Sequence, residues 1–323
     1  FRHFVGIYDL NATLERCALE HREVTLDDKY DLVEGKAYMT GIQALVRLPL
    51  DQKRLDLEAG HNTAGFISGY RGSPLGGYDQ QLRAAQKWLD VHDVKFWEGL
   101  NEDLGATAVW GSQQLGLFPG AQRDGLFGIW YGKAPGVDRT GDDFNHANAA
   151  GTSPLGGVLA VLGDDHMCKA STLPSQSEFA MQAAEIPVLN PASIQDVLDY
   201  GLHGWAMSRF SGGWSSMIAL ADTMDSGSVV DISLKRMNFV TPDFAFPDDG
   251  GHMRRADPPL EKERRLREFK LPAAQAWARA NQLDHVILPS AKPRVGLIVT
   301  GQAARDVFEA LAALGLTPDV ASR

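Results

Sequence analysis

The sequence predicts an α/β protein in which a mostly parallel sheet carries helices on both faces. Short apolar segments alternate with helical stretches along residues 64–220, which is typical of parallel strands joined by helical crossovers. Glycine-rich and polar segments follow three of the expected strands, at 69–79, 131–145 and 163–175. Because ligands bind in the loops after the strands of such sheets, we expect the functional site there.

Six apolar segments are short enough to be buried strands. They cover residues 64–70, 94–99, 124–131, 156–165, 186–191 and 214–222. The expected helices cover residues 78–90, a stretch that begins at Glu102, residues near 146–150, and 193–208 with Ser193 as the N-cap. An earlier helix is expected from about Gly41, with Pro49 interrupting it, and residues 132–144 are expected to form a long loop.

The chain divides into four expected segments. Residues 1–35 are a charged N-terminal extension, and residues 36–241 hold the alternating strands and helices of the main domain. Residues 242–292 are rich in proline and read as a linker with an exposed helical piece around the charged run 261–268. A strand and a helix then restart in 293–323, the start of a second α/β domain whose next strand begins near Thr317. We expect these residues to belong to a longer polypeptide.

Composition excludes several classes of protein. The net charge is −10, from 41 acidic and 31 basic residues, which disfavours nucleic acid and anionic membranes as partners. No apolar run approaches the roughly 20 residues of a membrane span, and no signal peptide is visible. The two cysteines, Cys17 and Cys168, are too few for a disulfide scaffold, a four-cysteine zinc site or an iron–sulfur cluster within this chain. Scarce cysteine fits a cytoplasmic protein.

Residues 96–114 hold the most informative acidic side chain. Glu102 stands where a helix should begin, and small residues such as Gly105 and Ala106 follow it, which lets another group approach the backbone. A carboxylate in this position is what a thiamine enzyme needs to share a proton with the aminopyrimidine ring of its cofactor. A glutamate in the first helical turn also commonly complements the helix dipole, so spacing alone leaves both interpretations open.

The segment 68–79, SGYRGSPLGGYD, is a strand-end loop that opens into a helix. It matches neither the dinucleotide fingerprint GxGxxG nor a phosphate-binding Gly-Lys-Ser/Thr loop. Its glycines permit close approach of a ligand, Arg71 could pair with a carboxylate, and Ser73 could donate to a carbonyl oxygen. The alternatives are a tight turn with a surface arginine, or a nucleotide site that uses residues 69–79.

The segment 131–143 follows the third expected strand. Its charged residues Lys133, Asp138 and Arg139 could contact a partner domain or a phosphate, or form a solvated surface.

The segment 163–178 follows the strongest strand. Asp164, Asp165 and His166 do not match a known metal-ligand spacing, so we expect a hydrogen-bonded turn that caps the next helix and no metal site. Cys168 is a lone thiol without an assigned role, and His203 lies on a helical pattern that predicts packing rather than catalysis.

Several long runs of the sequence match one family. They are TGIQALVRLP, AGFISGYRGSPLGGYDQ, GLNEDLGATAVWGSQQLGLFPGA, IWYGKAPGVDRTGDDFNHANAAGTSPLGG, GDDHMCKASTLPSQSEFAM and IPVLNPASIQDVLDYGLHGWAMSR. Together they resemble the indolepyruvate ferredoxin oxidoreductases, within the thiamine diphosphate-dependent 2-oxoacid:ferredoxin oxidoreductases, and most closely the N-terminal part of the long fused bacterial form. The resemblance is strong over residues 25–230 and weak over 290–320.

The resemblance implies that residues 36–241 are a thiamine pyrimidine-binding domain. Glu102 would contact the aminopyrimidine ring, with Asn101 and Gly105 beside the cofactor. The substrate would lie against residues of two strand-end loops, namely Gly69, Arg71, Gly72, Ser73, Pro74, Asp164 and Asp165. Arg71 departs from the family pattern, because related enzymes often carry proline at this position.

The resemblance also implies the reaction and its partners. An arylpyruvate or other 2-oxoacid would be oxidatively decarboxylated to an acyl-coenzyme A, with electrons passed through iron–sulfur clusters to ferredoxin. The chain lacks the Gly-Asp-Gly motif that holds Mg²⁺ and the diphosphate, so Mg²⁺ and the clusters are expected outside this segment, which alone should be inactive. A homodimer is expected by analogy. A non-catalytic scaffold or subunit-contact module is the alternative from another class.

Overall fold

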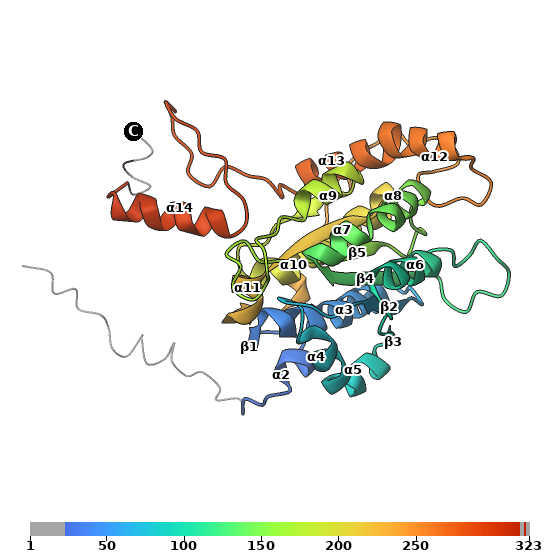
Figure 1. The fold of residues 1–323 in the computed structure, drawn as a ribbon, viewed down its shortest axis with the longest axis horizontal. Coiled ribbons are helices and arrows are strands. Elements are labelled where there is room, and N and C mark those ends of the chain that lie inside the picture. Colours follow the sequence, from blue (N-terminus) through green and yellow to red (C-terminus); the bar gives the residue numbers. More distant parts are fainter. Residues whose placement is uncertain (1–22, 317–319, 321–323) are drawn as a thin grey trace, which may run out of the picture.

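The computed structural model describes residues 23–316 and Val320 (Figure 1). Its centre is a six-stranded sheet with the strand order β3-β2-β4-β5-β7-β6, in which every pair is parallel. The strands are β2 (Ala64–Gly69), β3 (Val94–Phe96), β4 (Leu126–Lys133), β5 (Val158–Asp164), β6 (Val188–Leu189) and β7 (Ser215–Leu220). All six expected strands are therefore confirmed.

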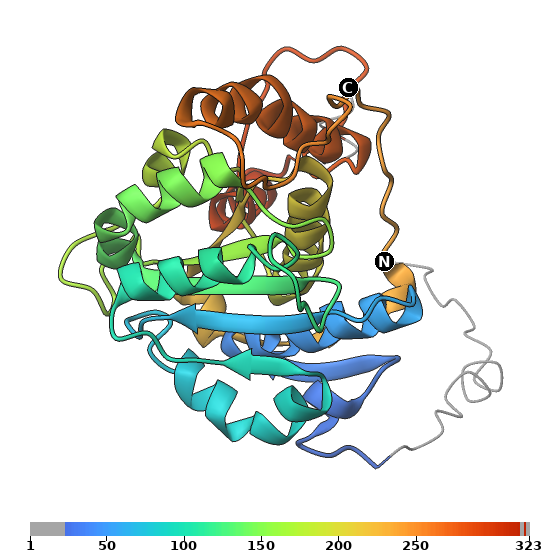
Figure 2. The ribbon, with the colours of Figure 1, turned by 90° about the vertical axis from the view of Figure 1, so that its right-hand side faces the viewer.

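Helices cover both faces of this sheet, as Figures 1 and 2 show. On one face lie α3 (Gly41–Glu58), α4 (Tyr78–Ala84), α5 (Gln86–Val91) and α10 (Ile194–Ser211). On the other lie α6 (Glu102–Ser112), α7 (Ala134–Arg139), α8 (Gly141–Ala150) and α9 (Glu178–Ala183). Side chains alternate between the two cores along each strand, so Ile129 faces the first and Trp130 the second. The predicted α/β class with helices on both faces is confirmed.

Helix α3 runs through Pro49 without a break, so the expected interruption there is wrong. Thr40 and Gln43 form a reciprocal capping box at its start. Proline has no N–H to donate to the carbonyl four residues earlier, here that of Leu45. The hydroxyl of Tyr78 donates to that carbonyl at 3.3 Å instead, so the free acceptor is satisfied from another element.

The long loop expected over residues 132–144 is also wrong, because α7 and α8 occupy this stretch and α8 begins at Gly141. The glycines of the segment favour a loop, but Val137 and Phe144 are fully buried in the second core. Burial of such side chains outweighs weak helix propensity.

A two-stranded antiparallel ribbon lies beside the main sheet and was not anticipated from the sequence. It pairs β1 (Lys36–Thr40) with β8 (Gly227–Asp231). The short helix α2 (Asp28–Asp31) precedes it, and the buried Arg47 of α3 donates to the carbonyls of Lys29 and Leu32. The expected extension 1–35 is thus described only from residue 23, and its first 22 residues, with Cys17, lie outside the described residues.

The helical piece expected in 242–292 is present and is partly exposed, as at Glu263 and Arg264, but its C-terminal part is packed on the domain, which corrects that prediction. It runs as α12 (Pro259–Arg265), a π-helical turn (Leu266–Lys270) and α13 (Leu271–Ala280). Trp277 is 3% exposed and belongs to the first core, close to α10. The boundary between residues 241 and 242 remains a prediction.

Residues 293–316 only partly follow the expected strand–helix unit. Helix α14 (Gln302–Ala313) forms, but residues 295–300 form no strand. Val295, Leu297 and Ile298 are exposed, and no strand of the described chain offers them hydrogen bonds. The strand expected at 317–320 lies almost wholly outside the described residues. Within the described part, no helix has both the length and the apolar character of a membrane span.

Candidate functional site

Three strand ends meet at one edge of the sheet. Gly69 ends β2 beside Tyr131 of β4, and Lys133 ends β4 beside Gly163 of β5. The segments that follow these strands are the loop 70–77, helix α7 and the loop 165–177. They coincide with the three segments that the sequence marked as ligand-binding loops, and parallel sheets bind ligands at this edge.

Glu102 is the first residue of α6 at this edge and is 7% exposed. Two contacts fix the start of the helix. The side chain of Asn101 caps it by accepting the N–H of Leu104 at 2.8 Å. The indole N–H of Trp130, on β4, donates to the carbonyl of Glu102 at 3.0 Å. The backbone of Glu102 is therefore held from both the loop and the sheet.

Two glycines near Glu102 lie where any side chain would collide with a neighbouring element. A methyl group on Gly136 of α7 would lie 2.5 Å from Cγ of Glu102 and 2.6 Å from its Oε1. A methyl group on Gly105 would lie 2.8 Å from Cα of Gly69. Gly105 thus lets α6 rest directly on the end of β2, and Gly136 lets the carboxylate of Glu102 lie against α7.

The carboxylate of Glu102 has no hydrogen bond or ion pair from any residue between 23 and 316. Its neighbour Asp103 accepts from Arg139 at 2.9 Å. That hydrogen bond is the main cause of the raised pKa of Arg139, to which the charge of Glu102 also contributes. Buried polar groups are nearly always paired, so a mostly buried carboxylate without a partner is a candidate ligand contact.

The loop 70–77 bridges the ends of β4 and β5. A methyl group on Gly72 would lie 2.6 Å from Cδ of Lys133, so the lysine stem lies across this glycine. The side chains of Pro74 and Leu75 cover Gly163, where an added methyl would lie 3.1 and 3.2 Å from them. Arg71 is exposed at the turn of the loop.

A cavity of about 350 Å³ opens between these segments. Ser73 lines it from the first loop, Lys133 and Asp138 from the end of β4 and α7, and residues 170–176 from the third loop. Lys133 is the only cationic residue that lines it, and no residue of the described chain pairs with its ammonium. Sequence reasoning named Ser73, Lys133 and Asp138 and marked 163–175 as a ligand-binding loop, but it named no residue of 170–176, whose signal is the hydroxyl-rich run STLPSQS.

Asp165 shapes the third loop. Its carboxylate accepts the backbone N–H groups of Lys169, Ala170 and Ser171 at 2.8, 2.7 and 3.0 Å. These hydrogen bonds, that from Ala170 first, lower the pKa of Asp165. The hydrogen-bonded turn that the sequence predicted is therefore confirmed, and both oxygens of Asp165 already serve it.

Asp164 ties this loop to α9. It accepts the hydroxyl of Ser177 at 2.6 Å and the N–H of the same residue at 2.9 Å. Ser177 is the N-cap of α9, so the predicted link to the next helix is also present. Burial raises the pKa of Asp164, against the effect of these two hydrogen bonds. The roles of Asp164 and Asp165 toward a substrate remain predictions.

Two further residues have local roles. Cys168 has a left-handed backbone with φ of 56°, and its thiol donates to the carbonyl of Ser171 at 2.9 Å within the same turn. His203 packs edge-on against Phe239 and Trp277, and burial lowers its pKa. The prediction that His203 is packed is confirmed.

No family model and no curated protein matches this chain. Among solved structures, one that matches is described as "2-oxoglutarate:ferredoxin oxidoreductase from Magnetococcus marinus with 2-oxoglutarate, coenzyme A and succinyl-CoA bound". The identity is 14%, the TM-score is 0.45, and the match covers 61% of this chain. The chain spans 31% of that protein, and the fold class rests on the sheet described above rather than on this similarity.

Proposed function

We propose that residues 36–241 are the pyrimidine-binding domain of a thiamine diphosphate-dependent 2-oxoacid:ferredoxin oxidoreductase of the indolepyruvate kind. One observation carries the proposal: Glu102 is 7% exposed, its carboxylate has no partner among the described residues, and it lies at the edge where parallel sheets bind ligands. The same residue is the one that the family resemblance marks for the cofactor.

The residues at this edge fit one half of the cofactor. A carboxylate without a partner can share a proton with a ring nitrogen, and Gly132 and Gly136 leave little side-chain bulk around it. Bound there, thiamine diphosphate would supply an electron sink for decarboxylation. The chain has no Gly-Asp-Gly motif for Mg²⁺ and the diphosphate, so we assign those contacts to other parts of the enzyme.

The chain's own residues have distinct tasks in this proposal. Glu102 holds the shared proton at its carboxylate, while Asn101 and Trp130 keep the start of α6 in place. Lys133 pairs with the carboxylate of the 2-oxoacid in the adjacent cavity, and Ser73 donates to its carbonyl oxygen. Coenzyme A, ferredoxin and the iron–sulfur clusters act outside this segment, in the complete, homodimeric enzyme.

The test is calorimetry with thiamine diphosphate and Mg²⁺ on the complete enzyme, combined with turnover of an arylpyruvate. Glu102→Gln should lower decarboxylation by about 10²–10⁴-fold, the usual contribution of a positioned acid or base. Asp103→Asn is the matched control, since Asp103 lies on the same helical turn but pairs with Arg139.

The outcomes separate the proposal from its rivals. Wild-type turnover in Glu102→Gln would remove this residue from the mechanism. Binding of a nucleotide in place of thiamine diphosphate would favour the nucleotide enzyme, and a stable fold that binds neither would favour the scaffold.

A further inference from the structure

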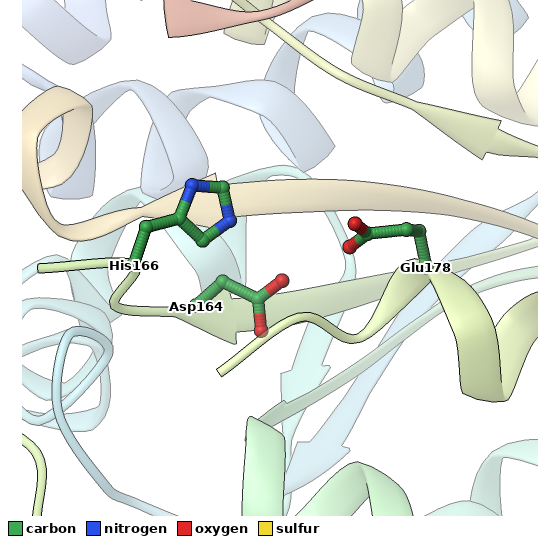
Figure 3. A group of neighbouring side chains, drawn as sticks. All are labelled: Asp164, His166 and Glu178. Atoms are coloured by element: carbon green, nitrogen blue, oxygen red, sulfur yellow. The ribbon is translucent and has the colours of Figure 1, made fainter. Parts of the chain in front are cut away.

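We propose that Asp164, His166 and Glu178 form a binding site for a divalent transition-metal ion of the Zn²⁺ type. The ligand atoms of the three side chains all lie within 4.8 Å of one another. Figure 3 shows the imidazole and the two carboxylates facing a common space, from the end of β5, the following turn and the start of α9. This inference does not depend on the proposed function, although Asp164 is also among the residues that the resemblance places against the substrate.

The backbone holds the three groups at this spacing. Asp164 is the last residue of β5 and Glu178 the first of α9, and Ser177 joins the two elements through both its hydroxyl and its N–H. His166 lies on the turn that Asp165 fixes through three backbone N–H groups. The site is therefore arranged by the fold before any ion binds, which reduces the free energy needed to assemble it.

The side chains are chemically available. No residue of the described chain hydrogen-bonds or ion-pairs with the side chains of His166 and Glu178. Asp164 is buried, and each of its oxygens accepts one hydrogen bond from Ser177, which leaves a second lone pair on each. A ligating carboxylate that also accepts a hydrogen bond from a neighbouring residue is the usual arrangement around protein metals.

The donor set selects the kind of ion. One imidazole with two carboxylates suits Zn²⁺ and related transition metals better than Mg²⁺ or Ca²⁺, which prefer oxygen alone. Three protein ligands leave a fourth position for water. His166 is exposed, so an ion can enter from solvent.

The sequence alone did not reveal this group. Asp164 ends a strand and His166 lies on the turn after it, so the alternation of side chains along a strand does not predict that these two side chains come together. Glu178 comes 12 residues after His166 and reaches the site only through the contact of Ser177 with Asp164. The turn between them also carries residues 170–176, the third wall of the 350 Å³ cavity. A bound ion would thus stiffen that wall.

The experiment uses Co²⁺, whose visible absorption reports the ligands, titrated into the whole chain. We expect saturable binding of one ion, with affinity lowered at least tenfold by His166→Ala and by Glu178→Gln. Ser177→Ala should also weaken binding, by about tenfold, because it removes a hydroxyl that orients Asp164. His146→Ala is the matched control, since His146 is an exposed histidine 3.6 Å from Asp142 on another helix.

Two results would overturn the assignment. One is the absence of saturable Co²⁺ absorption, or binding that His166→Ala and Glu178→Gln leave unchanged. The other is displacement of Co²⁺ by equimolar Mg²⁺, which would mean that the site does not prefer a transition metal to a hard cation. Thermal unfolding of each variant confirms that the chain remains folded, and both substituted side chains lie at least partly in solvent.

Discussion

Replacement of Gly136 by alanine should disturb Glu102 directly, because the two residues share the same space. The added methyl would lie 2.5 Å from Cγ and 2.8 Å from Cδ of Glu102. Contacts this short require the glutamate side chain to leave its position, at a cost of about 1–3 kcal/mol. Alanine is favoured over glycine in a helix by about 1 kcal/mol, which offsets part of this cost. Gly136→Ala should therefore lower the free energy of unfolding by about 0–2 kcal/mol.

A double-mutant cycle isolates the collision from the helix effect. Glu102→Ala removes Cγ, Cδ and Oε1, the three atoms that the methyl group would meet. In this background Gly136→Ala should stabilise the chain by about 0.5–1 kcal/mol, as at an unobstructed helical glycine. The coupling free energy between the two positions is then about 1–3 kcal/mol.

Urea denaturation of the four proteins measures this coupling, and Gly111→Ala is the control. Gly111 lies on α6, and a methyl group there would meet nothing within 4 Å. Gly111→Ala should therefore stabilise the wild-type protein and the Glu102→Ala variant by the same amount. If Gly136→Ala changes stability by the same amount in both backgrounds, Glu102 does not lie against α7 and the description of the site is incorrect.

Two further predictions concern the helix of residues 259–280. Trp277→Ala should lower the free energy of unfolding by about 3–5 kcal/mol, because the indole is 3% exposed in the first core. Leu260→Ala is the control: the leucine is 79% exposed on the same helix, so its loss should change the free energy of unfolding by less than about 0.5 kcal/mol. Equal urea midpoints would show that this helix is outside the core. Lys270 is buried, and burial lowers its pKa to about 7, while its ammonium donates to the carbonyls of Ala149 and Ala150. The unfolded chain therefore binds more protons than the folded one between about pH 7 and 10, so stability should rise with pH there, by up to about 1.4 kcal/mol per unit. Lys270→Met should flatten this rise in urea midpoints, and equal slopes would contradict the burial of the charge.

The strands were predictable because buried strands have a recognisable sequence pattern. Each is a short apolar run with turn residues at its ends, and Val158–Asp164, which is buried throughout, is the plainest case. Alternate side chains of such a strand must enter different cores, so helices on both faces follow from the same pattern. The carboxyl edge, and with it Glu102 and the loop after β2, could be located from this reasoning alone.

What the sequence did not predict depends on contacts between distant residues. Helix α3 passes through Pro49 because the carbonyl of Leu45 finds the hydroxyl of Tyr78, 33 residues away. Helix α7 forms in a glycine-rich segment because Val137 enters a core built from other elements. Local helix propensity predicts neither helix, because each depends on the surface that the segment packs against after the chain has folded.

The charged side chains at the candidate site are of two kinds: those that are paired within the described chain and those that have no partner there. Asp103 pairs with Arg139, and Asp165 accepts three backbone N–H groups, so the fold already uses both carboxylates. Glu102 and Lys133 lie beside them at the same edge, and neither has a partner within the described residues. Glu102 is therefore free to accept a hydrogen bond from a bound group or to share a proton with it. A carboxylate without a partner, at the edge where parallel sheets bind ligands, argues for a role in binding.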